Sequence, residues 1–86
     1  MDPVTRDTNA FVEALASVLK TAREEAQISQ TELAARAGLS QPHIGYIESE
    51  KRAPTVESLK RIAIALGVSA TDLVGKAEAL AASKRK

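Results

Sequence analysis

QTELAARAGLSQPHIGYIES, residues 30–49, has the pattern of two short helices joined by a tight turn. Ser29 and Glu32 form a Ser-x-x-Glu capping box, which predicts a helix that begins directly after the serine. Gly38 is expected to end this helix, because glycine adopts a positive φ at little cost. Ser40 is expected to cap the second helix, which covers the remainder of the stretch.

Upstream of this pair, apolar residues recur with helical spacing from Asn9 onward, which predicts a long first helix. Residues 1–8 contain a proline and two aspartates and show no such period. We therefore expect a flexible N-terminal arm over residues 1–8 and a helical domain over residues 9–82.

Downstream, Thr55 is expected to cap a fourth helix that Gly67 closes. Ser69 should cap a fifth helix at about residues 70–82, although Gly75 weakens the expectation that it is continuous. The last residues, 83–86, form a basic tail. Five helices and no strand make this an all-α fold.

Composition excludes several classes of function. The 86 residues include no cysteine and one histidine, so disulfides, thiol catalysis and Cys-ligated metals are excluded, and no metal or cofactor is expected. The longest strictly apolar run, Ile62–Leu66, is far too short to span a bilayer, so no membrane partner is expected. The polar N-terminus does not resemble a signal peptide, and a cytoplasmic location is the expectation. The net charge is +1, so any polyanion must meet a locally arranged surface.

One face of the helix that follows Ser40 has no expected role in the core. Its residues are uncharged and slim, which suits a helix lying in the major groove of double-stranded DNA. A charged face would instead bind phosphates without reading bases. The residues on this face are Gln41, Pro42, Gly45, Tyr46 and Ser49.

These elements occur in an order that resembles the lambda-repressor-like (Xre/Cro-type) helix-turn-helix family. The resemblance covers Leu19–Val74, about two-thirds of the chain. Single pieces are weak signals, but the ordered set is specific. The matching residues are Ile28-Ser29-Gln30, Glu32-Leu33-Ala34, Ala37 to Pro42, Ile44, Ile47-Glu48, Lys51 to Pro54, Leu59, Ile62-Ala63 and Ala65 to Val68.

The resemblance implies a five-helix lambda-repressor-like domain that binds duplex DNA, usually as a homodimer. It implies that Gln41 is the principal base reader, with Pro42, Gly45 and Tyr46 beside it. It also implies that Arg23 and Glu48 form a structural pair. The implied contacts to the DNA backbone are Gln30, Thr31, Ser40, His43, Ser49, Lys51, Arg52 and Thr55.

Glu50 departs from the family pattern, because many relatives have glycine there. Either the preceding helix is one residue longer, or Glu50 adopts a strained conformation. Its negative charge near phosphates should either weaken DNA binding slightly or sharpen the binding geometry. Arg61, in the fourth helix, is expected on a solvated face.

The fifth helix carries apolar residues with no obvious partner in so small a domain, which favours a dimer contact. The alternative is that Ala77 and Leu80 fold back on Phe11 and Val12 of the first helix. The predicted dimer contact consists of Leu73, Val74, Ala77 and Leu80.

The sequence therefore predicts a transcriptional regulator, a repressor, that binds a pseudo-palindromic operator as a homodimer. One alternative is the antitoxin of a toxin–antitoxin pair, in which the tail beyond Val74 would bind a toxin. Another is a helical protein-binding adaptor without DNA function. No enzyme is expected, because His43 has no nucleophile or orienting carboxylate arranged with it.

Overall fold

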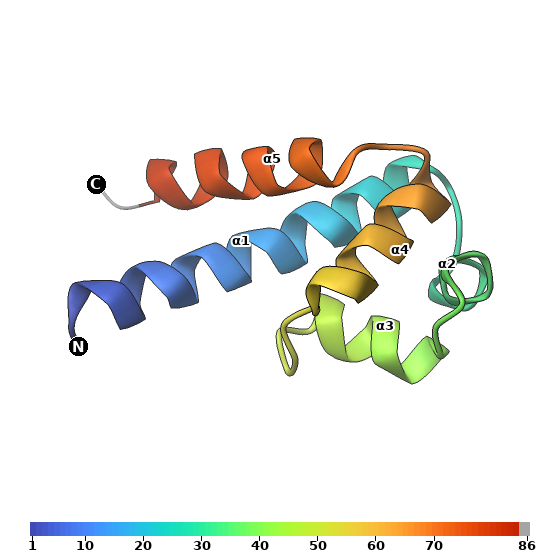
Figure 1. Ribbon diagram of the computed structural model, residues 1–86, viewed down its shortest axis with the longest axis horizontal. Helices are drawn as coiled ribbons and strands as arrows, with labels where there is room; N and C mark the ends of the chain where they lie inside the picture. Colours follow the sequence, from blue (N-terminus) through green and yellow to red (C-terminus); the bar gives the residue numbers. More distant parts are fainter. Residues whose placement is uncertain (85–86) are drawn as a thin grey trace.

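The computed structural model describes residues 1–84, which form five helices and no strand (Figure 1). α1 and α5 lie antiparallel and side by side along the long axis of the molecule, and the three shorter helices gather at one end of this pair (Figure 1). The described part of the chain measures 38 × 21 × 19 Å. The helices are α1 (Pro3–Glu25), α2 (Gln30–Ala37), α3 (Gln41–Glu48), α4 (Val56–Leu66) and α5 (Ala70–Ser83).

Four of the five helices begin where the sequence predicts. In each case a serine or threonine oxygen accepts a hydrogen bond from the backbone N–H three residues further on, which satisfies a donor that the helix leaves unpaired. The capping residues of α2 to α5 are Ser29, Ser40, Thr55 and Ser69.

The prediction of a flexible arm over residues 1–8 is wrong, because α1 begins at Pro3 and not at Asn9. Asp2 caps the helix: its Oδ1 accepts from the Thr5 N–H at 2.9 Å and its Oδ2 from the Thr5 hydroxyl at 2.8 Å. These two hydrogen bonds hold the pKa of the Asp2 carboxyl below its usual value. Proline suits the first helical position, so the Asp-Pro pair is a start signal.

At the other end of the chain, α5 runs without interruption through Gly75 and includes Ser83. Lys84 ends it as the C-cap. The predicted basic tail therefore begins inside a helix, and its last residues, Arg85 and Lys86, lie outside the described part of the chain.

The core draws at least one large aliphatic side chain from every helix. Neither aromatic residue is fully buried, because Phe11 is partly buried and Tyr46 is exposed. Removing each of these aliphatic groups from water stabilises the fold by about 1.5–3 kcal/mol. The fully buried large side chains are Leu19, Leu33, Ile44, Ile47, Ile62 and Leu73.

α5 uses its apolar face within the monomer, which corrects the predicted dimer contact. Leu73 is 1% exposed and Ala77 is 0% exposed, and the partly buried Leu80 packs against the same core. Small residues on both helices, including Ala14 on α1, let the two backbones approach closely. The alternative arrangement, with α5 folded back on α1, is the one observed. Only Val74 of the predicted set lies outside this core.

Four helices end in the same way, with one residue in the left-handed region followed by an N–H that bonds the carbonyl five residues back. Gly38 and Gly67 adopt this conformation after α2 and α4, as the sequence predicts. Gln27 does so after α1 at φ 60° and Glu50 after α3 at φ 68°. α3 therefore ends at Glu48, and of the two alternatives for Glu50 the strained conformation is the correct one.

Replacing Glu50 by glycine removes this strain. We expect Glu50→Gly to raise the free energy of unfolding by about 0.5–1 kcal/mol, because the left-handed region costs a side chain more than it costs glycine. Urea denaturation measures the change. The matched control is Glu50→Gln, which removes the charge and keeps the strain. An equal gain from both variants would assign the effect to charge and refute the conformational argument.

Candidate nucleic-acid interface

Two glutamines from different helices meet at the start of α3. The Gln41 Nε2 donates to the Gln30 Oε1 at 2.7 Å. The Gln30 Nε2 in turn donates to the Glu48 Oε1 at 3.1 Å. The helix-turn-helix therefore holds its exposed Gln41 through a neighbour on α2.

The Glu48 carboxylate is also the partner of Arg23 on α1. The Arg23 Nε donates to the Glu48 Oε2 at 2.7 Å, and its Nη2 donates to the Oε1 at 3.0 Å. A third bond runs from the Arg23 Nη1 to the Ile28 carbonyl at 2.8 Å. The planar guanidinium thus binds the carboxylate in a two-pronged geometry that lysine could not reproduce.

Burial makes this pair costly to break. The side chains of Arg23 and Glu48 are 12% and 4% exposed. The hydrogen bond to Glu48 raises the pKa of Arg23 above its ordinary value, which is already high enough to keep an arginine charged at neutral pH. The pair that the family resemblance implies is present, and it connects α1 to the C-terminal end of α3.

The surface of α3 beside Gln30 and Gln41 is narrow because Gly45, which has no side chain, lies there. A Cβ at this position would stand 3.6 Å from the Gln30 Oε1 and 3.7 Å from the Gln41 Nε2, which is ordinary van der Waals contact. Gly45 is half-buried under the glutamine pair. It therefore contributes space and backbone to this face, and its lack of a side chain leaves Gln41 as the projecting group.

A second group of predicted residues gathers at the turn after α3. The Tyr46 ring is 42% exposed, as the sequence predicts, and the Arg52 guanidinium carbon lies 5.8 Å from the ring centroid. The Tyr46 carbonyl accepts the backbone N–H groups of Lys51 at 2.9 Å and Arg52 at 3.2 Å, and the Ser49 hydroxyl at 3.3 Å. The turn thus presents two exposed cations, Lys51 and Arg52, and Arg52 lies beside the aromatic ring.

A third group surrounds a polar hollow of about 230 Å³ between the starts of α3 and α4. His43 and Thr55 line it. So does Arg61, whose Nη1 donates to the Ala37 carbonyl at 3.3 Å while its guanidinium pairs with Glu57 at 3.1 Å. The expectation that Arg61 lies only on a solvated face missed this bond to the end of α2. The Glu57–Arg61 spacing indicates the ion pair within α4, but no sequence pattern indicates the bond to Ala37.

The remaining predicted residues stand alone at helix starts. Thr31 and Pro42 are exposed in the first turns of α2 and α3. The Ser40 oxygen accepts from the His43 N–H at 3.2 Å, so it serves as a cap. The structure thus brings most of the predicted residues together in three groups on α2, α3 and the start of α4.

No three His, Cys, Asp or Glu side chains in residues 1–84 are grouped so that they could hold a metal ion. None of the helices in the same range has the length and hydrophobicity to cross a membrane. The arrangement of α2 and α3, with an uncharged polar face on the second helix and cations beside it, is that of a DNA-binding helix-turn-helix protein.

Comparison with known proteins agrees. Residues 19–73 match a family described as helix-turn-helix. The fold is similar to that of an XRE-family like protein from Pseudomonas syringae pv. tomato, with a TM-score of 0.82 and 32% identity, over 92% of this chain and 96% of that one. The chain therefore belongs to the XRE-type helix-turn-helix family of DNA-binding transcription regulators, which is not a class of enzymes.

Several relatives are longer than this chain. An uncharacterized HTH-type transcriptional regulator of Mycobacterium tuberculosis, Rv0474, is 38% identical over 79% of this chain and 49% of its own length. The immunity repressor protein of Bacillus phage phi105 is 33% identical over 67% of this chain and 40% of its own length. The chain thus spans about half the length, or less, of these two relatives. The HTH-type regulator y4dJ of Sinorhizobium fredii is 44% identical over 60% of this chain and 68% of its own length.

Removing Arg23 should uncouple α3 from α1. We expect Arg23→Met to lower the free energy of unfolding by about 3 kcal/mol, because it leaves the Glu48 carboxylate buried without its counter-charge. The matched control is Arg36→Met, whose pair with Glu32 is exposed and should contribute less than about 1 kcal/mol. Urea denaturation of both variants measures the difference. Similar losses of unfolding free energy in the two variants would show that the buried Arg23–Glu48 pair stabilises the fold no more than an exposed pair does.

Proposed function

We propose that the protein is a sequence-specific transcriptional regulator that places α3 in the major groove of a pseudo-palindromic operator. The observation that carries the proposal is the hydrogen bond from the Gln41 Nε2 to the Gln30 Oε1 at 2.7 Å. It holds the one long polar side chain of the α3 face in a defined orientation before DNA arrives, so less side-chain entropy is lost on binding.

The hydrogen bond to Gln30 leaves Gln41 with one free amide hydrogen and a free carbonyl oxygen, the two groups that it needs to read a base. An amide nitrogen has two hydrogens, and Gln30 receives one of them. The second hydrogen and the Gln41 Oε1 are then available for the N7 and N6 positions of one adenine. Pro42 and Tyr46 are exposed on the same helix, and they would contact neighbouring base edges or thymine methyl groups.

Contacts to phosphates would come from both ends of α3. Lys51 and Arg52 are exposed at the turn after it. At its start, His43 lies beside Thr55, where the first turn of α4 offers unpaired N–H groups. These contacts would supply most of the affinity and make it fall steeply with salt. The other proposed backbone contacts are Gln30, Thr31, Ser40 and Ser49.

Repression is the proposed mode of action, and occupancy of the operator is the proposed mechanism. It is supported by the similarity to a phage immunity repressor. A two-fold dimer would place two copies of α3 in major grooves about 34 Å apart, one turn of the DNA helix.

We place the dimer contact on the surface of α4 and the start of α5. Ile64 is 66% exposed and Val68 is 37% exposed. Val74 lines a shallow open hollow on α5 with Ala70. Ile64, Val68 and Val74 lie outside the monomer core, and a second copy would cover them in an isologous contact.

Gln41→Ala should weaken binding to the preferred operator by about 1–3 kcal/mol and relax its specificity at one base pair. Arg52→Ala is the control, because a phosphate contact should weaken all duplexes about equally. Fluorescence anisotropy with the DNA upstream of the gene and with a scrambled duplex, over a salt series, measures both. Equal binding of the two duplexes by the unmodified protein would refute sequence-specific recognition of that DNA.

Ile64→Lys should prevent dimerisation, because it places a charge in the apolar contact. Sedimentation equilibrium should show only monomers at concentrations at which the unmodified protein is a dimer, and half-site cooperativity should be lost. Val4→Lys is the control, since Val4 is 76% exposed near the start of α1, away from this surface. A dimer that survives Ile64→Lys unchanged would place the contact elsewhere.

A further inference from the structure

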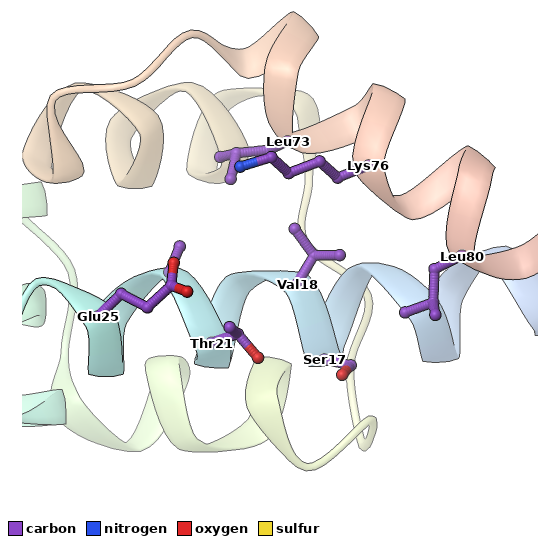
Figure 2. A pocket seen from close by; sticks show the side chains of 8 residues that line it. Ser17, Val18, Thr21, Glu25, Leu73, Lys76 and Leu80 are labelled. Atoms are coloured by element: carbon purple, nitrogen blue, oxygen red, sulfur yellow. The ribbon is translucent and has the colours of Figure 1, made fainter.

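A crevice between α1 and α5 takes no part in the proposed recognition of DNA (Figure 2). Its volume is about 290 Å³, and residues of α2, α3 and α4 do not line it. Five of its residues come from α1 and three from α5. They are Ser17, Val18, Thr21, Ala22, Glu25, Leu73, Lys76 and Leu80.

The crevice has an apolar floor and a polar rim. Figure 2 shows Val18 pointing up from α1 and Leu80 pointing down from α5 into the space between the helices. The charged lining residues are Glu25 on α1 and Lys76 on α5, whose side chain extends toward Leu73 in Figure 2. An apolar floor with a few polar groups at its rim is typical of small-molecule sites, and this volume is at the low end of their range. It has room for a ligand on the order of ten non-hydrogen atoms.

The charge at the rim is not balanced. The Lys76 Nζ lies 3.4 Å from an Asp72 carboxylate oxygen, so its charge is already offset. Glu25 has no ion-pair partner among residues 1–84. It is the last residue of α1, where the helix dipole is negative and favours a cation. Arg23, the basic residue of that last turn, is bonded to Glu48 instead.

We propose that this crevice binds a small amphipathic amine. The ammonium group would lie against the Glu25 carboxylate and the Thr21 hydroxyl at the rim. Its apolar body would cover Val18, Leu73 and Leu80. The ligand would supply the positive charge that the end of α1 lacks. The proposal does not depend on DNA binding, because the crevice and the surface around Gln41 share no residue.

A titration with three probes of nearly equal size tests the choice of charge. They are 2-phenylethylammonium, the neutral 2-phenylethanol and the anionic 3-phenylpropionate. Two-dimensional amide NMR should show shifts confined to residues 17–25 and 73–80. We expect the ammonium to bind about threefold to fivefold more tightly than the alcohol, as one exposed ion pair allows, and the anion to bind most weakly. Equal affinities, a preference for the anion, or no shifts in these segments would overturn the proposal.

Two neighbouring substitutions separate a specific contact from general electrostatics. Glu25→Gln should abolish the preference for the ammonium over the alcohol. Glu24→Gln removes the same charge from a residue that does not line the crevice, and it should leave the preference intact. Both positions are exposed at the end of α1, so neither change should unfold the protein. An unchanged preference in Glu25→Gln, or an equal loss in both variants, would refute the assignment of the amine to Glu25.

Discussion

The buried ion pair between Arg23 and Glu48 is the constraint on which the rest of the site depends. Three guanidinium nitrogens bond the Glu48 carboxylate and the Ile28 carbonyl, so one side chain fixes α1, α3 and the connection to α2. Glu48 also accepts from Gln30, which holds Gln41. The exposed Gln41 is thus connected to the longest helix through three hydrogen-bonded contacts. In the described residues no buried side-chain nitrogen or oxygen is left without a partner, so the burial is compensated.

α1 can support this arrangement because its different faces contact the core, α3 and α5. Leu15 and Leu19 enter the common core, and Ala14 allows α5 to approach. Arg23 turns toward α3, whereas Val18 and Glu25 line the crevice with α5. All of these contacts lie in the C-terminal half of this 23-residue helix. α2 and α3 have eight residues each and gain their stability from tertiary packing, because isolated helices of this length are not stable in water.

Some helix ends are specified by three or four adjacent residues, and others are not. Ser29, Ser40, Thr55 and Ser69 cap helices as expected, because a cap needs only the residue and the three that follow it. The start at Asp2 and Pro3 was missed although its signal is equally local. The end at Gln27 has no such signal, since a glutamine at φ 60° adopts this conformation only when contacts on both sides hold it there. Glu50 is an intermediate case. Its departure from the family pattern indicated either a longer α3 or a strained residue. The hydrogen bond from the Lys51 N–H to the Tyr46 carbonyl accompanies the strained, left-handed conformation.

From the sequence alone, the five helices, most of their boundaries and the exposed polar face of α3 could be predicted, because caps, glycine stops and apolar periods act within one turn of helix. The tertiary structure alone decided which surfaces remain free. Leu73 and Ala77 are apolar in either arrangement, and only the close approach of α5 to α1 turned them from a dimer surface into core. The bond between Gln30 and Gln41 and the bond from Arg61 to Ala37 likewise join separate helices. Such contacts depend on the angle and distance between helices, which no pattern within one helix specifies.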